Sequence, residues 1–180
     1  MTFLHDPFFW AFMSMFGLVA ACTVVGSKKI GSNTFLGMCI VTVFDLGRFL
    51  LVLPFCPQFR FDIGGWHGLV GGIVCLIGFT FCLPAFLIRP FNSATGRTQL
   101  ITTGFHGIVR NPIYLGEVLW CLGWAILFRS TIGVCLVPLW WAGLLFLIII
   151  EEESLERELG QAYLEYKHRV QGRIIPGLSI

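Results

Sequence analysis

The sequence predicts an all-α membrane protein, a polytopic helical bundle of about five transmembrane helices with the last two as a hairpin, followed by a C-terminal cytoplasmic amphipathic helix. Two observations carry this prediction. Of the 180 residues, 56% are hydrophobic and only 12% are charged, whereas a soluble domain has about 25% charged residues because its surface faces water. The apolar residues also occur in long blocks rather than periodic stripes, which is typical of membrane spans. The same composition excludes a soluble fold and a disordered chain.

Five apolar segments are the predicted spans: 8–26, 34–55, 63–88, 112–128 and 131–150. A helix needs about 20 apolar residues to cross the hydrocarbon core, so the second, third and fifth segments are ample. Only Arg129 and Ser130 separate the fourth from the fifth, which predicts a tight helical hairpin. Lys28 and Lys29 follow the first segment and no basic residue precedes it. That charge order is wrong for a cleaved signal peptide, so we expect a retained span.

The basic residues outside the spans predict the orientation. Five crossings place nine Lys and Arg residues on one side and two on the other, and cytoplasmic loops carry the excess. We therefore expect the N-terminus outside and the C-terminus in the cytoplasm. The nine residues are Lys28, Lys29, Arg89, Arg97, Arg110, Arg157, Lys167, Arg169 and Arg173.

Charge and cysteine content remove two other classes of function. The net charge is only +2 and no basic cluster alternates with aromatic residues, so we expect no nucleic-acid partner. The seven cysteines are scattered through apolar runs without metal-ligand spacing. We expect them to be small packing residues rather than a disulfide framework or a metal site.

Three ionisable residues fall inside predicted spans. Asp45 and Arg48 are three residues apart on one helical face, a spacing at which they can neutralise each other. Glu117, in the fourth segment, has no partner nearby in the sequence. Ionisable groups at membrane depth are functional candidates by default, and Glu117 is the more suggestive of these positions.

The connection between residues 89 and 110 is the long loop of the sequence, and long ordered loops tend to be functional. Gly104 and Gly107 flank His106 and permit a tight turn or close backbone approach to a ligand. Arg110 and Asn111 precede Pro112, which suits the first turn of a helix. Both therefore lie at a helix N-terminus, which favours an anionic group. Alternatively, Arg110 contacts lipid headgroups and His106 is an ordinary loop residue.

After the fifth span the chain turns acidic, with Glu151, Glu152 and Glu153 in succession. The apolar positions that follow fit one face of a helix, and Gly160 predicts a bend or a close approach. These positions are Leu155, Leu159, Ala162, Tyr163, Tyr166 and Val170. One interpretation is a helix on the membrane surface. However, carboxylates beside an anionic leaflet are better placed if they face a ligand.

Hairpin topology brings the end of the fifth span back to the start of the fourth. We therefore expect Arg110 and the glutamates to meet at one corner. Such a corner suits a zwitterionic, hydroxyl-bearing ligand, with the carboxylate of the ligand on Arg110 and its amine or hydroxyl groups on the glutamates.

A two-part motif runs through this region. Gly104-x5-Arg110-Asn111-Pro112-x-Tyr114 is followed about forty residues later by Glu151-Glu152-x2-Leu155-x3-Leu159-Gly160-x2-Tyr163-x2-Tyr166, and Arg173-x2-Pro176 closes it. This pattern, over residues 97–177, resembles the isoprenylcysteine carboxyl methyltransferase family. It is also similar to the wider group of integral-membrane methyltransferases that includes the phospholipid N-methyltransferases. The resemblance implies S-adenosylmethionine in a cytoplasm-facing pocket with a lateral opening for a lipophilic substrate.

Two positions depart from the family pattern. Asn111 stands where the family has His, so the role of that imidazole does not transfer. The glycines at 104 and 107 do not complete the Gly-x-Gly of the phospholipid enzymes, which modestly favours a carboxyl methyltransferase. The acceptor can be a carboxyl, thiol or amine group on a lipophilic or small molecule. An amine must lose a proton, for which Glu117 and His106 are the candidate bases.

The resemblance and the residues together give a set of expected site positions. The expected catalytic residues are Arg110 and Glu117. The expected cofactor-binding residues are Leu100, Gly104, His106, Arg110, Asn111, Tyr114, Glu151, Glu152 and Tyr163.

We expect one integral-membrane domain over 1–180. Within it, the first three spans (1–88) form a scaffold on the acceptor side and residues 89–180 form the cofactor-binding region. Two alternatives remain open. One is a membrane NADPH-dependent sterol-type reductase, which resembles the stretch from Arg110 to Glu117. The other is a non-enzymatic membrane scaffold or assembly factor whose glutamates and amphipathic helix bind a partner protein.

Overall fold

A computed structural model describes residues 3–26, 34–94 and 100–178. The described part of the chain is all-helical and contains no strand, as the sequence predicts. It holds six α-helices and two 3-10 helices: η1 (Phe3–His5), α1 (Pro7–Gly26), α2 (Thr34–Leu51), α3 (His67–Ala94), η3 (Gly104–Gly107), α4 (Pro112–Leu127), α5 (Thr131–Leu159) and α6 (Gln161–Arg169).

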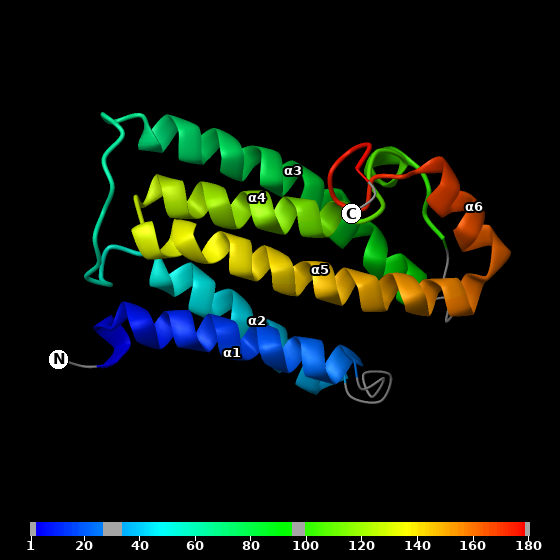
Figure 1. The fold of residues 1–180 in the computed structure, drawn as a ribbon, viewed down its shortest axis with the longest axis horizontal. Helices are drawn as coiled ribbons and strands as arrows, with labels where there is room; N and C mark the ends of the chain where they lie inside the picture. The colour runs from blue at the N-terminus through cyan, green and yellow to red at the C-terminus, as the bar shows by residue number, and fades with distance from the viewer. Residues whose placement is uncertain (1–2, 27–33, 95–99, 179–180) are drawn as a thin grey trace.

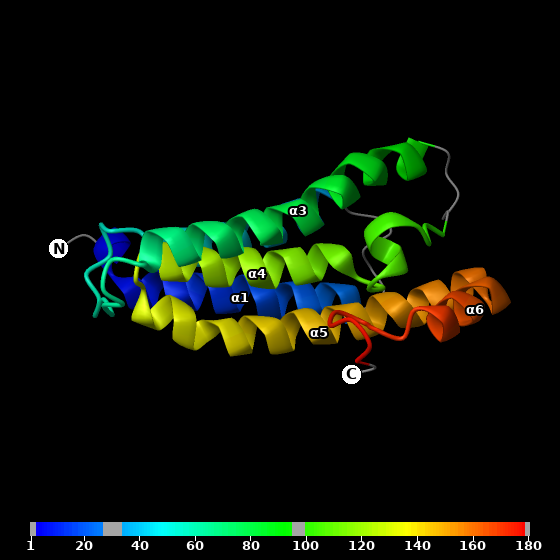
Figure 2. The same ribbon diagram turned by 90° about the horizontal axis from the view of Figure 1, so that it is seen from above.

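The five long helices lie side by side along the long axis of the molecule (Figure 1). α1 packs against α2 and α5, and α4 packs against α3 and α5. The loop that carries η3, helix α6 and the C-terminal segment gather at one end, while the turns around residues 52–66 and 129–130 lie at the other. Figure 2 shows the last turns of α3 leaving the side of α4 at the end where α6 lies. The two parts of the sequence motif, residues 104–114 and 151–176, are therefore collected at one end of the bundle.

Two of the described helices are long and apolar enough to cross a bilayer: α1, over Pro7–Val24, and α5, over Thr131–Leu159. Shorter apolar stretches occur at His67–Leu83 in α3 and along α4. Large apolar side chains point outward, as at Phe8, Phe12 and Phe16 of α1. A surface of this kind indicates association with a membrane.

Two helix boundaries differ from the predicted spans because of turn chemistry. α2 ends at Leu51 rather than at residue 55, since Pro54 cannot donate a helical hydrogen bond and disfavours helix in the residue before it. α3 begins at His67 rather than at residue 63. Gly64 and Gly65 precede it with φ of 61° and 83°, a conformation that no helix continues.

Two helices extend beyond the predicted ends of their spans. α3 reaches Ala94, so Arg89 belongs to the helix and the connection to α4 is shorter than expected. α5 continues through Glu151, Glu152 and Glu153 to Leu159, because the residues after 150 are good helix formers despite their charge. The predicted bend is confirmed at Gly160, whose φ of 54° ends α5 and begins α6.

Small residues allow the helices to approach closely. A Cβ atom added to Gly71 of α3 would lie 2.5 Å from the backbone nitrogen of Leu127, and one at Gly123 of α4 would lie 2.5 Å from that of Cys75. Cys75 and Cys82 lie in the same contact and point their thiols at carbonyl oxygens of α4. The prediction of cysteines as packing residues is confirmed at these positions and at buried Cys121.

Arg60 ties together the end of the bundle opposite the polar motifs. Its guanidinium donates to the carbonyl oxygens of Val52 (2.7 Å), Leu53 (2.7 Å), Cys56 (3.1 Å) and Phe128 (2.5 Å). These groups follow the ends of α2 and α4, where helical carbonyls lack intrahelical partners. One guanidinium therefore holds the turns at this end together, whereas the charged motifs lie at the opposite end.

Some predictions lie outside the described residues. Lys28, Lys29 and Arg97, which contribute to the charge asymmetry, fall in the two internal gaps.

Candidate functional site

The start of α4 and the far part of α5 meet at the polar end of the bundle, as the hairpin topology predicts. Arg110, just before α4, donates from Nε to Oε1 of Glu152 at 2.9 Å and from Nη2 to Oε2 at 3.3 Å. Both side chains are almost fully buried, with 4% and 2% of their surfaces exposed. This is a bidentate pair of the geometry that makes Arg–carboxylate contacts strong.

The same arginine also anchors the C-terminal segment. Arg110 Nη1 donates to the carbonyl oxygens of Val170 and Gln171, both at 2.8 Å. Its backbone nitrogen donates to Gly172 O, and the Asn111 nitrogen donates to Arg173 O. The two residues before α4 are therefore hydrogen-bonded to the backbone of the segment that follows α6. These bonds hold the C-terminal segment against the start of α4.

Glu152 is the centre of this network. Asn111 Nδ2 donates to its Oε1 at 2.9 Å, and Arg173 Nε donates to its Oε2 at 3.0 Å. Arg173 belongs to the sequence motif but is not among the expected site residues. The signal that could have found it is its position in the closing Arg-x2-Pro element.

Tyr114 and Glu151 form a second pair beside the first. The Tyr114 hydroxyl donates to Glu151 Oε2 at 2.8 Å, and both residues are half-buried. Pro112 is the first residue of α4, as predicted, and Asn111 is its N-cap. The paired glutamates thus diverge in role, because Glu152 is buried in the arginine network whereas Glu151 is partly open beside a hydroxyl group.

The other expected site residues lie on the side of this corner formed by α6 and the loop before α4. Tyr163, Tyr166 and Val170 form a buried apolar cluster with Leu100 against it, and the Tyr166 hydroxyl donates to His106 O at 2.8 Å. Gly104 opens η3 with a φ of 63° and is exposed. Leu100 and Tyr163 therefore belong to one apolar cluster, and Tyr166 of the same cluster holds the backbone of His106.

Burial shifts the pKa values of the titratable groups in this cluster. It raises the pKa of Tyr166 to about 12 and raises that of Tyr163 too, where the nearby Glu152 carboxylate acts in the same direction and Arg110 opposes it. Burial lowers the pKa of His106. Desolvation disfavours the charged form in every case, so at neutral pH the phenols are protonated and His106 is neutral.

Glu117 lies away from the corner, deeper along α4, and is paired. Arg48 of α2 donates from Nη2 to Glu117 Oε1 at 3.2 Å and also to Asp45 Oδ1. The predicted neutralisation of Asp45 by Arg48 is therefore confirmed. Glu117 finds its partner 69 residues away in the chain.

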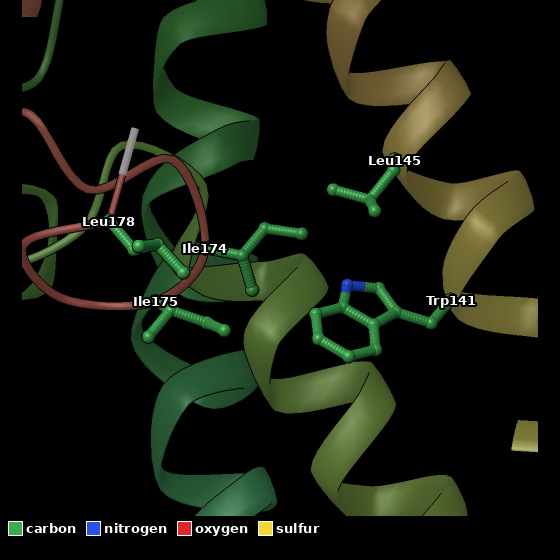
Figure 3. A pocket seen from close by; sticks show the side chains of 5 residues that line it. All are labelled: Trp141, Leu145, Ile174, Ile175 and Leu178. Atoms are coloured by element: carbon green, nitrogen blue, oxygen red, sulfur yellow. The ribbon is translucent and has the colours of Figure 1, made fainter. Parts of the chain in front are cut away.

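A small pocket lies between α5 and the C-terminal segment (Figure 3). Its walls are the apolar side chains of Trp141, Leu145, Ile174, Ile175 and Leu178. A lining of this composition fits hydrocarbon rather than a charged ligand.

Comparison with known proteins shows similarity to a curated sterol reductase and to a family of methyltransferases. Over 90 residues, 47% of this chain, the sequence is 33% identical to the Delta(14)-sterol reductase TM7SF2 of Mus musculus. That stretch spans about 20% of the length of the reductase. No solved structure matches the chain. The phospholipid methyltransferase family matches residues 67–162, which contain α4, the Arg110–Glu152 pair and the Tyr114–Glu151 pair. Because this match covers more than half of the 180 residues, the chain belongs to the phospholipid methyltransferase family, a family of membrane methyltransferases.

Proposed function

We propose that this chain is a multi-pass, S-adenosylmethionine-dependent methyltransferase whose cofactor site is the cytoplasmic corner between α4, α5 and α6. The observation that carries the proposal is the meeting of Arg110, Asn111 and Glu152 inside the stretch that matches the family. We propose further that residues 1–88 form the acceptor-side scaffold and residues 89–180 the cofactor-binding region.

The chemistry of the corner fits such a cofactor, which has a carboxylate, an ammonium group and ribose hydroxyls. Glu151 and the Tyr114 hydroxyl are half-buried and hydrogen-bonded to each other, and the oxygen atoms of both groups can accept hydrogen bonds from an ammonium group or from ribose hydroxyls. Arg173 is 19% exposed and presents a cation. When bound, the cofactor supplies an electrophilic methyl group on a positively charged sulfur.

The chain's own residues divide into two roles in this proposal. Arg110 binds Glu152 and the carbonyl oxygens of Val170 and Gln171, so it holds the corner closed and keeps water out. Glu151, Tyr114, Asn111 and the open backbone at Gly104 bind the cofactor. Leu100, His106 and Tyr163 line the other side of the cofactor site. Glu117 is proposed to accept the proton that the substrate loses when it is methylated.

Calorimetric titration of the full chain in detergent micelles with S-adenosylhomocysteine tests the proposal. We expect micromolar binding by the wild type. Glu151→Gln and Tyr114→Phe should each weaken it about tenfold, the effect of one lost charge-assisted hydrogen bond. Glu153→Gln is the matched control: the same charge is removed two residues away, on an exposed side chain, and binding should not change. Absence of wild-type binding would refute the proposal.

A second candidate function is NADPH-dependent reduction of a sterol-type substrate. The observation that favours it is the 33% identity to the Delta(14)-sterol reductase. The same calorimetry distinguishes the two, because a reductase should bind NADPH and leave S-adenosylhomocysteine unbound.

A further inference from the structure

The hydroxyl group of Tyr166 makes a contact that the proposed function does not use. It donates to the carbonyl oxygen of His106 at 2.8 Å, across 60 residues of sequence. His106 lies near the end of η3, where the carbonyl groups of a short helix lack partners within the helix. Tyr166 is 4% exposed. A buried hydroxyl on α6 therefore fixes one point of the loop that precedes α4.

Helix α6 holds this hydroxyl in place. Tyr166 belongs to the buried apolar cluster of α6, against which Leu100 packs. One turn further on, Val170 O accepts from Arg110 Nη1 at 2.8 Å, so the end of α6 is tied to the start of α4. Burial raises the pKa of Tyr166 to about 12, because desolvation disfavours the phenolate. At neutral pH the hydroxyl is therefore protonated and can donate.

A second contact holds the same loop from the side of α3. The centres of the Phe105 and Phe81 rings lie 4.7 Å apart, and Phe81 belongs to α3. Figure 2 shows the loop between the last turns of α3 and helix α6. Gly104, which opens η3, is exposed, and a Cβ atom there would meet nothing within 4 Å. The loop is thus fixed at Phe105 and His106 and open at Gly104.

The loop leads directly into the proposed cofactor corner. His106 lies four residues before Arg110, which is held by Glu152, and the intervening Val109 is fully buried. Loss of the Tyr166 hydroxyl would leave the Arg110 end of the loop anchored. Residues 104–107 would lose a hydrogen bond that determines where their backbone lies. The Tyr166 contact therefore acts on the part of the loop that carries Gly104.

We propose that Tyr166 is a positioning residue for cofactor binding, whose hydroxyl holds η3 where the backbone at Gly104 meets the cofactor. This inference rests on the proposed function. Tyr166 acts through the His106 carbonyl rather than by touching the cofactor. A loop that is held in its bound position before binding loses less conformational freedom when the ligand arrives, which strengthens binding. The family match ends at residue 162, so it assigns no role to Tyr166.

Tyr166→Phe tests the proposal, because it keeps the ring and removes the hydroxyl. The full chain in detergent micelles is titrated calorimetrically with S-adenosylhomocysteine, and hydrogen–deuterium exchange over residues 100–110 is followed without ligand. We expect the dissociation constant to rise about fivefold, the effect of one lost neutral hydrogen bond. Exchange at the amides of Ile108 and Val109, which donate to Phe105 O, should accelerate. Exchange within α4 and α5 should stay the same.

Two further variants accompany this one. Phe105→Leu loosens the same loop on the side of α3, so it should also weaken binding and accelerate exchange in the loop. It carries the test if Tyr166→Phe does not fold. Ser154→Ala is the matched control, because it removes an exposed hydroxyl that donates to Glu158 at the same end of the bundle. Both binding and loop exchange should be unchanged in this variant.

Three results would overturn this inference while leaving the proposed function intact, provided that the wild type binds S-adenosylhomocysteine. The first is wild-type affinity in Tyr166→Phe. The second is weaker binding without faster exchange in the loop. The third is faster exchange throughout α4 and α5, because Tyr166 would then support the fold as a whole rather than the position of η3. Absence of binding by the wild type would refute the proposed function, and this inference with it.

Discussion

Glu152 is the residue on which the polar end of the bundle depends. Its carboxylate accepts hydrogen bonds from Arg110, Asn111 and Arg173 and is 2% exposed. Glu152→Ala leaves one fully buried guanidinium without its counter-charge, so we expect the free energy of unfolding to fall by about 3–5 kcal/mol. Thermal melting in detergent measures this change.

The control for this prediction is the neighbouring residue. Glu153 is exposed, and Glu153→Ala removes the same charge from the same helix with little expected effect, within about 0.5 kcal/mol. Equal melting temperatures for the two variants would show that the network contributes nothing to stability.

Part of this network is predictable from the sequence. The hairpin of α4 and α5 requires that residues near 110 and 152 meet, whatever the details of packing. By contrast, Arg173 lies 21 residues after Glu152 and Arg48 lies 69 residues before Glu117. These pairings depend on how α6 folds back and how α2 packs beside α4, which local patterns do not encode.

At the scale of the helices, the contact of α3 with α4 depends on particular glycines. A Cβ atom on Gly71 would lie 2.5 Å from Leu127 N and 2.8 Å from Gly123 O, both backbone atoms that cannot turn aside. We expect Gly71→Ala to destabilise the protein by about 1–3 kcal/mol through overpacking.

Gly72, the next residue, provides the matched comparison. A Cβ atom there meets nothing within 4 Å, so Gly72→Ala should be neutral or stabilise by up to about 1 kcal/mol through helix propensity. Denaturant titration of both variants in the same detergent measures the difference. Similar effects at the two positions would contradict close packing at Gly71.

The helices themselves are predictable, but some of their ends are not. Hydrophobic blocks locate α1, α2, α3, α4 and α5, and Pro112 and Gly160 mark boundaries correctly. The length of the apolar block does not predict the end of α5. This helix continues past residue 150 into charged residues because their helix propensity is high. The apolar block also does not predict the start of α3. Gly64 and Gly65 add no polar group to the block, but their positive φ values prevent the helix from beginning before residue 67.

The whole molecule has two different ends, and this asymmetry predicts its orientation in a membrane. The end with residues 52–66 and the α4–α5 turn carries Arg60 and Arg129, and Arg60 is occupied by backbone carbonyls. The opposite end carries Arg110, Arg173 and the basic residues of α6. Since cytoplasmic segments carry the excess of Lys and Arg, we expect α6 in the cytoplasm and the turn before α3 outside.

Cysteine labelling in intact cells with a membrane-impermeant maleimide measures this orientation. Ile63 precedes α3 and Glu165 lies on α6, and both are exposed. In a background where exposed Cys39 and Cys135 are replaced by Ser, Ile63→Cys should react in intact cells, and Glu165→Cys should react only after lysis. The reverse pattern would invert the proposed orientation and place the Arg110–Glu152 corner outside. Labelling of both positions in intact cells would contradict the five-span topology, because α3, α4 and α5 between them must cross the membrane an odd number of times.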